Sequence, residues 1–162
     1  MSPALIFLPF VAPICLWVAF SDMKLMKIPN LAVVALLLVY VIVGPFALPF
    51  GDYAWRYLNI VVILLFGFLL NQGGLIGAGD AKFAAAMAPF VSAAMVTNLV
   101  FIFAAVLIGA YATHRMFRAI PAVRNGFSDW KSWENPKFPM GLALAGCLFL
   151  YLSVVAWYGL VP

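Results

Sequence analysis

Residues 57–76 read YLNIVVILLFGFLLNQGGLI, a stretch of twenty positions without one charged side chain. A helix needs about 20 predominantly apolar residues to cross the hydrocarbon core of a bilayer. The whole chain has this character, because hydrophobic types make up 67% of its 162 residues and charged types 9%. A soluble domain carries roughly 25% charged residues. The sequence therefore predicts an all-α, polytopic membrane protein, since a soluble fold of this size could not cover so much apolar surface.

Further apolar runs set the number of expected membrane spans. The runs occupy residues 3–20, 31–50, 57–76, 82–95, 97–113 and 139–160. The region 82–113 leaves two interpretations open. It forms either one long helix kinked at Pro89, or two short helices broken near Ser92 or near Thr97 and Asn98.

The distribution of Lys and Arg favours the second interpretation. With six spans and an external N-terminus, eight of the nine basic residues face the cytoplasm and only Arg56 lies outside. The eight are Lys24, Lys27, Lys82, Arg115, Arg118, Arg124, Lys131 and Lys137. With five spans the bias reverses to three inside and six outside. The positive-inside rule thus predicts about six spans, N-out and C-out, with spans four and five short at about 15 residues each.

This topology predicts a single membrane-embedded domain over residues 1–162, with cytoplasmic loops at about 21–30, 72–82 and 114–138. The last loop alternates basic residues with Phe and Trp. It either lies on an anionic cytoplasmic leaflet or forms an ordinary solvated loop. Because the basic residues flank apolar segments, the net charge of +4 indicates membrane topology and not nucleic-acid binding.

The five acidic residues are the most informative candidates for chemistry. Asp52 falls in a short outer turn, and Asp129 and Glu134 fall in the basic loop. Asp22 and Asp80 each lie at the expected cytoplasmic end of a helix, directly against apolar sequence. Carboxylates near hydrocarbon are energetically costly, so both are candidates for function. The plainer interpretation is that they are juxtamembrane charges that only set topology.

A run of glycines precedes the second aspartate. Residues 73–80 read GGLIGAGD, and such glycines break a helix and allow another chain to approach the backbone closely. An extended peptide could pair with backbone groups exposed there, although small residues also serve helix packing in membranes. Two carboxylates at one site can supply an acid and a base around a single water, without a metal or a nucleophilic side chain.

Several other polar or reactive residues have less specific interpretations. Cys15 and Cys147 lie in apolar runs and are expected to be buried small hydrophobes. His114, the only histidine, lies beside Arg115 at an expected helix end, where a role in helix electrostatics or at an interface is favoured over catalysis or metal binding. No His-rich or phosphate-binding element accompanies the aspartates, so neither a metal nor a cofactor is expected.

Three segments together resemble the type IV prepilin peptidases, which belong to the GxGD membrane aspartyl proteases. The resemblance covers nearly the whole chain. The matching segments are Gly77-Ala78-Gly79-Asp80 with the following Ala81-Lys82, Asp22-Met23-Lys24 through Ile28-Pro29-Asn30, and residues 138–145 (FPMGLALA), where Met140 replaces a usual aromatic residue. The chain has no CxxC motif. It is therefore similar to the short peptidases that serve tight-adherence (Flp-type) pili, and methyltransferase activity is not expected.

The resemblance implies an endopeptidase of the bacterial inner membrane with its active site facing the cytoplasm. The substrate would be a prepilin or pseudopilin precursor, cut after a glycine that ends its short basic leader. Asp22 and Asp80 would be catalytic. The residues expected to support the site or bind substrate are Lys24, Pro29, Asn30, Gly77, Gly79, Lys82, Pro139 and Gly141. Besides substrate, only membrane lipids are expected as partners.

Two other classes of function fit the same composition. A small proton- or cation-coupled transporter could use both aspartates as ion ligands, but it would more typically hold them near the bilayer midplane. A non-catalytic subunit of a pilus or secretion machine would tolerate loss of either aspartate. An archaeal preflagellin peptidase is a close variant of the first interpretation.

Overall fold

The computed structural model describes residues 2–160, and every regular element in that range is helical. The long helices are α1 (Pro3–Leu25), α2 (Asn30–Ala47), α4 (Tyr57–Gln72), α6 (Val96–Ala119) and α8 (Met140–Trp157). Shorter elements connect them: α3 (Phe50–Trp55), α5 (Ala78–Met87), η1 (Ala88–Phe90), η2 (Ala93–Met95), α7 (Pro121–Gly126) and η3 (Lys131–Trp133). The predicted all-α bundle is confirmed.

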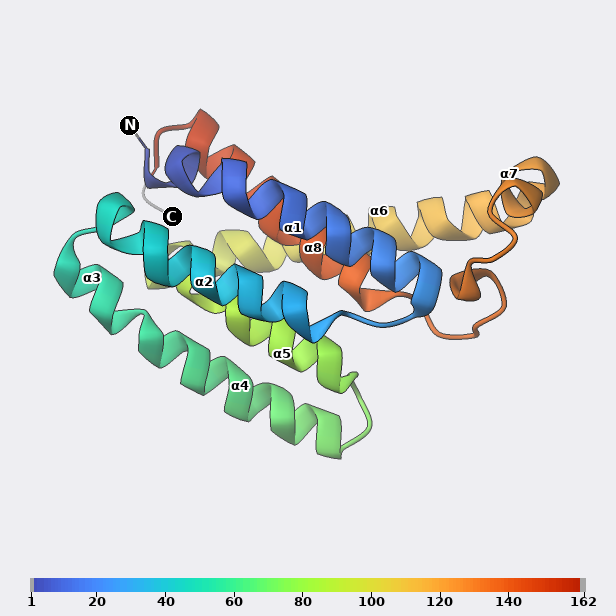
Figure 1. The fold of residues 1–162 in the computed structure, drawn as a ribbon, viewed down its shortest axis with the longest axis horizontal. Coiled ribbons are helices and arrows are strands. Elements are labelled where there is room, and N and C mark those ends of the chain that lie inside the picture. The colour runs from blue at the N-terminus through green and yellow to red at the C-terminus, as the bar shows by residue number, and fades with distance from the viewer. Residues whose placement is uncertain (1, 161–162) are drawn as a thin grey trace.

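The chain runs back and forth between two ends of an elongated bundle (Figure 1). Both termini lie at one end, where the Ser2 hydroxyl donates a hydrogen bond to the backbone oxygen of Leu160 at 3.1 Å. The turns that follow α1, α4 and α6 lie at the other end.

Five helical stretches are long and apolar enough to cross a membrane. They are Pro3–Leu25, Asn30–Ala47, Phe50–Gln72, Ala93–Ala119 and Met140–Trp157. The fourth expected span, residues 82–95, is therefore not a helix of spanning length. The chain returns between the two ends there through the 10-residue α5 and the short turns η1 and η2.

Local sequence explains why this return segment is short. Pro89 has no N–H and cannot continue the α-helical ladder, and α5 gives way to 3-10 geometry at Ala88. The helix is sheltered by α4, where Gly67 lies so close to Ala81 that a Cβ atom on Gly67 would meet the Ala81 Cβ at 2.9 Å. Small residues allow such close helix packing in a membrane.

The fifth expected span is longer than predicted. It was expected to cover residues 97–113 at about 15 residues, whereas α6 extends over 24 residues to Ala119. The helix α1 likewise continues through Leu25 into the expected loop 21–30. Residues 21–25 and 114–119, which were expected to lie in loops, are therefore helical.

The packed interior is built around α1 and α8, the most extensively paired helices. Phe7 on α1 lies against Tyr40 on α2 and Phe90 of η1, with ring centroids 6.2 and 5.0 Å apart. Cys15 and Cys147 are buried and unbridged in the same interior, as expected. The helices α4 and α6 instead expose rows of large apolar side chains, as expected for surfaces that face lipid.

Candidate active site

Asp22 lies in the last turn of α1 and is buried, with 5% of its surface exposed. Its Oδ2 accepts a 2.6 Å hydrogen bond from the backbone N–H of Gly141, in the first turn of α8. The N–H groups of a first helical turn have no partner within the helix. A carboxylate there is also favoured by the helix dipole. The start of α8 therefore holds the Asp22 carboxylate in place from 119 residues away.

The chain turns sharply directly after Asp22. Met26 adopts a left-handed conformation with φ of 54° and donates its N–H to the backbone oxygen of Asp22 at 2.9 Å. The Ser21 hydroxyl donates to the backbone oxygen of Lys27 at 3.0 Å. These two hydrogen bonds fix the start of the connection to α2 and keep it beside Asp22.

Asp80 lies in the first turn of α5, which begins near it as the glycine run predicted. Its Oδ2 accepts the N–H of Gly77, the residue before the helix, at 3.1 Å. Burial raises the pKa of the Asp80 carboxyl above its ordinary range, and the Gly77 hydrogen bond opposes that rise. Gly79 faces the α1–α2 connection, and a Cβ atom on it would meet the Ile28 Cβ at 3.4 Å.

Asp22 and Asp80 line one open cavity of about 840 Å³ at the end of the bundle opposite the termini. The walls come from the α1–α2 connection, the glycine-rich turn between α4 and α5, and the segment that leads into α8. Two carboxylates on the wall of one cavity can supply an acid and a base for a water there.

Most of the residues expected to support the site also lie at this cavity. Asn30, Gly77, Gly79, Lys82 and Pro139 line it. The Lys82 Nζ donates to the Asn30 Oδ1 at 3.4 Å and so joins α5 to the start of α2. Gly141 acts through its N–H on Asp22 and not as a lining residue.

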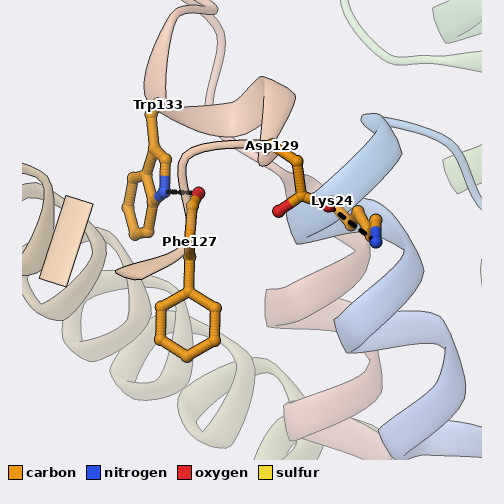
Figure 2. Close-up of polar contacts among 4 residues, drawn as sticks. All are labelled: Lys24, Phe127, Asp129 and Trp133. Atoms are coloured by element: carbon orange, nitrogen blue, oxygen red, sulfur yellow. Dashed lines mark hydrogen bonds and ion pairs between the residues drawn. The ribbon is translucent and has the colours of Figure 1, made fainter. Parts of the chain in front are cut away.

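Two expected site residues lie elsewhere. Pro29 precedes α2 and is not a lining residue of the cavity. Lys24 points to the loop between α6 and α8, where its Nζ lies 2.7 Å from the Asp129 Oδ2 (Figure 2). The hydrogen bond from Lys24 lowers the pKa of the exposed Asp129 carboxyl. Lys24 thus ties α1 to the loop.

Several further residues line the cavity that were not among those expected at the site, and four of them have polar or aromatic side chains. Lys27, Lys137 and Phe138 lie on the cavity wall, together with Asn71, whose Nδ2 donates to the Ile76 oxygen at 2.8 Å. Asn71 was a recognisable candidate, since it lies in an apolar run directly before the glycines. The other three reach the cavity only because the turn after α1 and the segment before α8 fold over it.

No group of three or more His, Cys, Asp and Glu side chains that could hold a metal ion occurs within residues 2–160. His114 is buried, with 2% of its surface exposed, and packs against aromatic rings. The cavity groups capable of acid–base chemistry with a water are therefore the two aspartates and the neighbouring lysines.

The fold and the cavity define a polytopic membrane protein with two carboxylates on one cavity at one end of its helices. The chain belongs to the type IV leader peptidase family, whose sequence model matches residues 9–113. That match includes both aspartates and ends before α8. No curated protein and no solved structure matches the chain.

Proposed function

We propose that this protein is a membrane aspartyl endopeptidase that removes the short basic leader from prepilin-like precursors on the cytoplasmic face of the bacterial inner membrane. The observation that carries the proposal is that Asp22 and Asp80, 58 positions apart in the sequence, line one open cavity. Membership of the leader peptidase family supplies the class of substrate.

In the proposed reaction the two carboxylates share one proton and hold a water between them. The ionised carboxylate takes a proton from the water as it attacks the scissile carbonyl carbon. The protonated carboxyl donates to the carbonyl oxygen and stabilises the tetrahedral intermediate. As the C–N bond breaks, the carboxyl that took the water proton donates it to the leaving amine. The other carboxylate takes a hydroxyl proton from the tetrahedral intermediate as the product carboxyl group forms, so the dyad ends singly protonated.

The cavity walls suit an extended peptide. The turn between α4 and α5 contributes Gly74, Gly77 and Gly79, and glycines allow a peptide backbone to approach closely. Both aspartates lie near the ends of helices that carry apolar surfaces. A precursor whose own membrane helix lies alongside could therefore present its leader junction at the same depth.

The position of the carboxylates argues against a coupled transporter. Transporter sites typically lie near the bilayer midplane, between interrupted helices. Here both aspartates lie at the same end of the bundle, away from the termini. A protease that cuts at the membrane surface needs its site at that depth.

Coexpression with a candidate prepilin tests the proposal. Leader removal is followed by gel shift, and the new N-terminus is sequenced. We expect a single cut after the glycine that ends the leader, and no cut when that glycine is replaced by a bulky residue. A prepilin that stays intact beside correctly inserted enzyme, for each cognate candidate tried, would contradict the proposal.

A further inference from the structure

The loop between α6 and α8 is joined to the rest of the bundle by an unbroken column of aromatic rings. Phe20 of α1 packs edge-on against Trp130, with centroids 5.8 Å apart. Trp130 stacks on Trp133 at 5.5 Å, and Trp133 stacks on His114 of α6 at 5.1 Å. His114 meets Phe138 edge-on at 5.8 Å. Aromatic pairs at these separations contribute stability beyond their buried area.

The two rings at the ends of this column lie close in sequence to Asp22 and Gly141, the two partners of the hydrogen bond described above. Phe20 lies two residues before Asp22, and Phe138 lies three residues before Gly141. The column and the Gly141–Asp22 hydrogen bond therefore close a ring of contacts. We expect a shift along the column to disturb the start of α8 relative to the end of α1.

Polar contacts reinforce the same loop. Arg115 and Arg118 of α6 donate to the backbone oxygens of Pro136 and Asn135 at 3.3 and 3.4 Å. The Trp133 Nε1 donates to the Phe127 oxygen at 2.9 Å, while Lys24 pairs with Asp129 (Figure 2). The exposed ion pair alone contributes little. Two of the five rings, Trp133 and His114, are buried, at 2% exposed each.

His114 is the fourth of the five rings in the column, and its contacts are with aromatic rings on both sides. Neither ring nitrogen has a hydrogen-bond partner within residues 2–160. His114 thus acts here as a flat ring between Trp133 and Phe138.

We infer that His114 and Trp133 are positioning residues, which fix the Gly141 N–H donor against the Asp22 carboxylate through the aromatic column. The inference rests on the proposed peptidase function for its catalytic consequence. The structural role of the column can be tested without measuring peptidase activity. His114, Trp133 and Phe138 all lie outside residues 9–113, the part that matches the leader peptidase family.

The first experiment compares His114→Ala with His114→Phe. Removing the ring should lower kcat by about tenfold to hundredfold with little change in KM, because small displacements of a catalytic group cost that much. His114→Phe should restore kcat, since it keeps a flat ring and has no nitrogen to satisfy. A His114→Phe enzyme as slow as His114→Ala would overturn the packing role.

A second pair of variants guards against a general loss of folding. Phe20 and Phe10 lie on the same helix and are similarly exposed, at 54% and 51%. Phe20 ends the column, whereas Phe10 makes no ring contact within residues 2–160. Phe20→Ala should lower kcat, and Phe10→Ala should leave it unchanged. Equal rates for both variants and the wild type would overturn the inference.

Amide exchange gives a readout that does not depend on catalysis. With glycine-selective labelling, the Gly141 amide should be protected in the wild type and in His114→Phe, and should exchange faster in His114→Ala. Unchanged Gly141 protection in His114→Ala would refute the column even if the peptidase is active. Conversely, loss of protection in a protein that cleaves no prepilin would support the column and reject the proposed function.

Discussion

Adding one methyl group to Gly141 should disable the enzyme while leaving it inserted. A Cβ atom at this position would meet the Asp22 Oδ2 and the Ile28 Cγ1 at 2.9 Å each, and the Asp22 Cβ at 3.0 Å. Carbon atoms prefer separations of about 3.5 Å or more, so Asp22 or the start of α8 must move by about 0.6 Å. Such overpacking typically costs about 1–3 kcal/mol of stability.

The effect on catalysis should exceed the effect on folding. A displacement approaching 1 Å at a reacting group can cost about 10²-fold in rate, so we expect Gly141→Ala to lower kcat by about tenfold to hundredfold. The rate is measured on purified enzyme with a detergent-solubilised prepilin, alongside thermal unfolding of the same sample. Gly141 also donates the 2.6 Å hydrogen bond to Asp22, and movement would lengthen it.

Gly109→Ala is the matched control. Gly109 lies within α6, and a Cβ atom there would meet nothing within 4 Å. Alanine inside a helix is favoured over glycine by about 1 kcal/mol, so this variant should be fully active and at least as stable. A Gly141→Ala enzyme that cleaves within about twofold of the wild-type rate would refute the claim that Gly141 fixes the Asp22 carboxylate.

Three further predictions concern topology, the glycine turn and the mechanism. A reporter at Asn125 should lie in the cytoplasm and one at the C-terminus outside; an external Asn125 would remove the common cytoplasmic face of the aspartates and the loop. Gly79→Leu should abolish cleavage without preventing insertion, because its side chain would collide with Ile28, whereas Gly79→Ala should retain activity; normal processing by Gly79→Leu would show that close approach is not needed there. EDTA should leave the cleavage rate unchanged, and so should the variants Cys15→Ser and Cys147→Ser, since the proposed dyad uses neither a metal nor a thiol. Activity that disappears with chelation and returns with a divalent ion would point to a metal mechanism.

The fold class was predictable from composition, but the shape of individual spans was not. The sequence predicted a short fifth span because the apolar run stops at His114. The helix α6 continues to Ala119, because no helix-breaking residue follows until Ile120 and Pro121, where the residue before a proline disfavours helix. Hydropathy marks where lipid contact ends, and backbone chemistry marks where the helix ends.

The fourth span illustrates the opposite case. Residues 82–95 are apolar enough to suggest a crossing, but Pro89 limits the helix to Ala78–Met87. The segment is tolerated because α4 packs against it through Gly67 and Ala81. This packing depends on contacts between two helices, and the sequence of residues 82–95 alone does not indicate it. The charge pattern favours an even number of passes, and that number stays a prediction.

The candidate site was predictable where a local motif marked it. The two aspartate segments and the glycine run lie at one cavity. Lys24 was expected there because it follows Asp22, yet it pairs with Asp129. On a helix, residues two positions apart point in different directions, and sequence proximity is then a poor guide to a shared site.

The contacts that support the site from other parts of the chain could not be predicted from local sequence patterns. Phe127, Trp130 and Trp133 were interpreted as residues of an interfacial or solvated loop, since they alternate with basic residues. These three rings contact one another in sequence, and Trp133 stacks on His114, so segments are joined that no sequence periodicity connects. The Gly141 N–H donor became recognisable only when α1 and α8 were seen together.

The most direct test of the central claim is the cleavage rate of Asp22→Asn, Asp80→Asn and the double variant. Asparagine keeps the shape of the side chain but cannot exchange a proton with water. Each single variant should insert and accumulate normally while cleaving no prepilin, and the double variant should be no worse, because the two carboxylates act as one unit. The wild-type rate should depend on pH through two apparent pKa values that belong to the pair.

Asp52→Asn and Asp129→Asn are the matched controls, since neither residue lines the cavity that holds the dyad. Both should process prepilin at the wild-type rate. If either Asp22→Asn or Asp80→Asn still removes the leader at a substantial rate, the paired-aspartate mechanism is wrong.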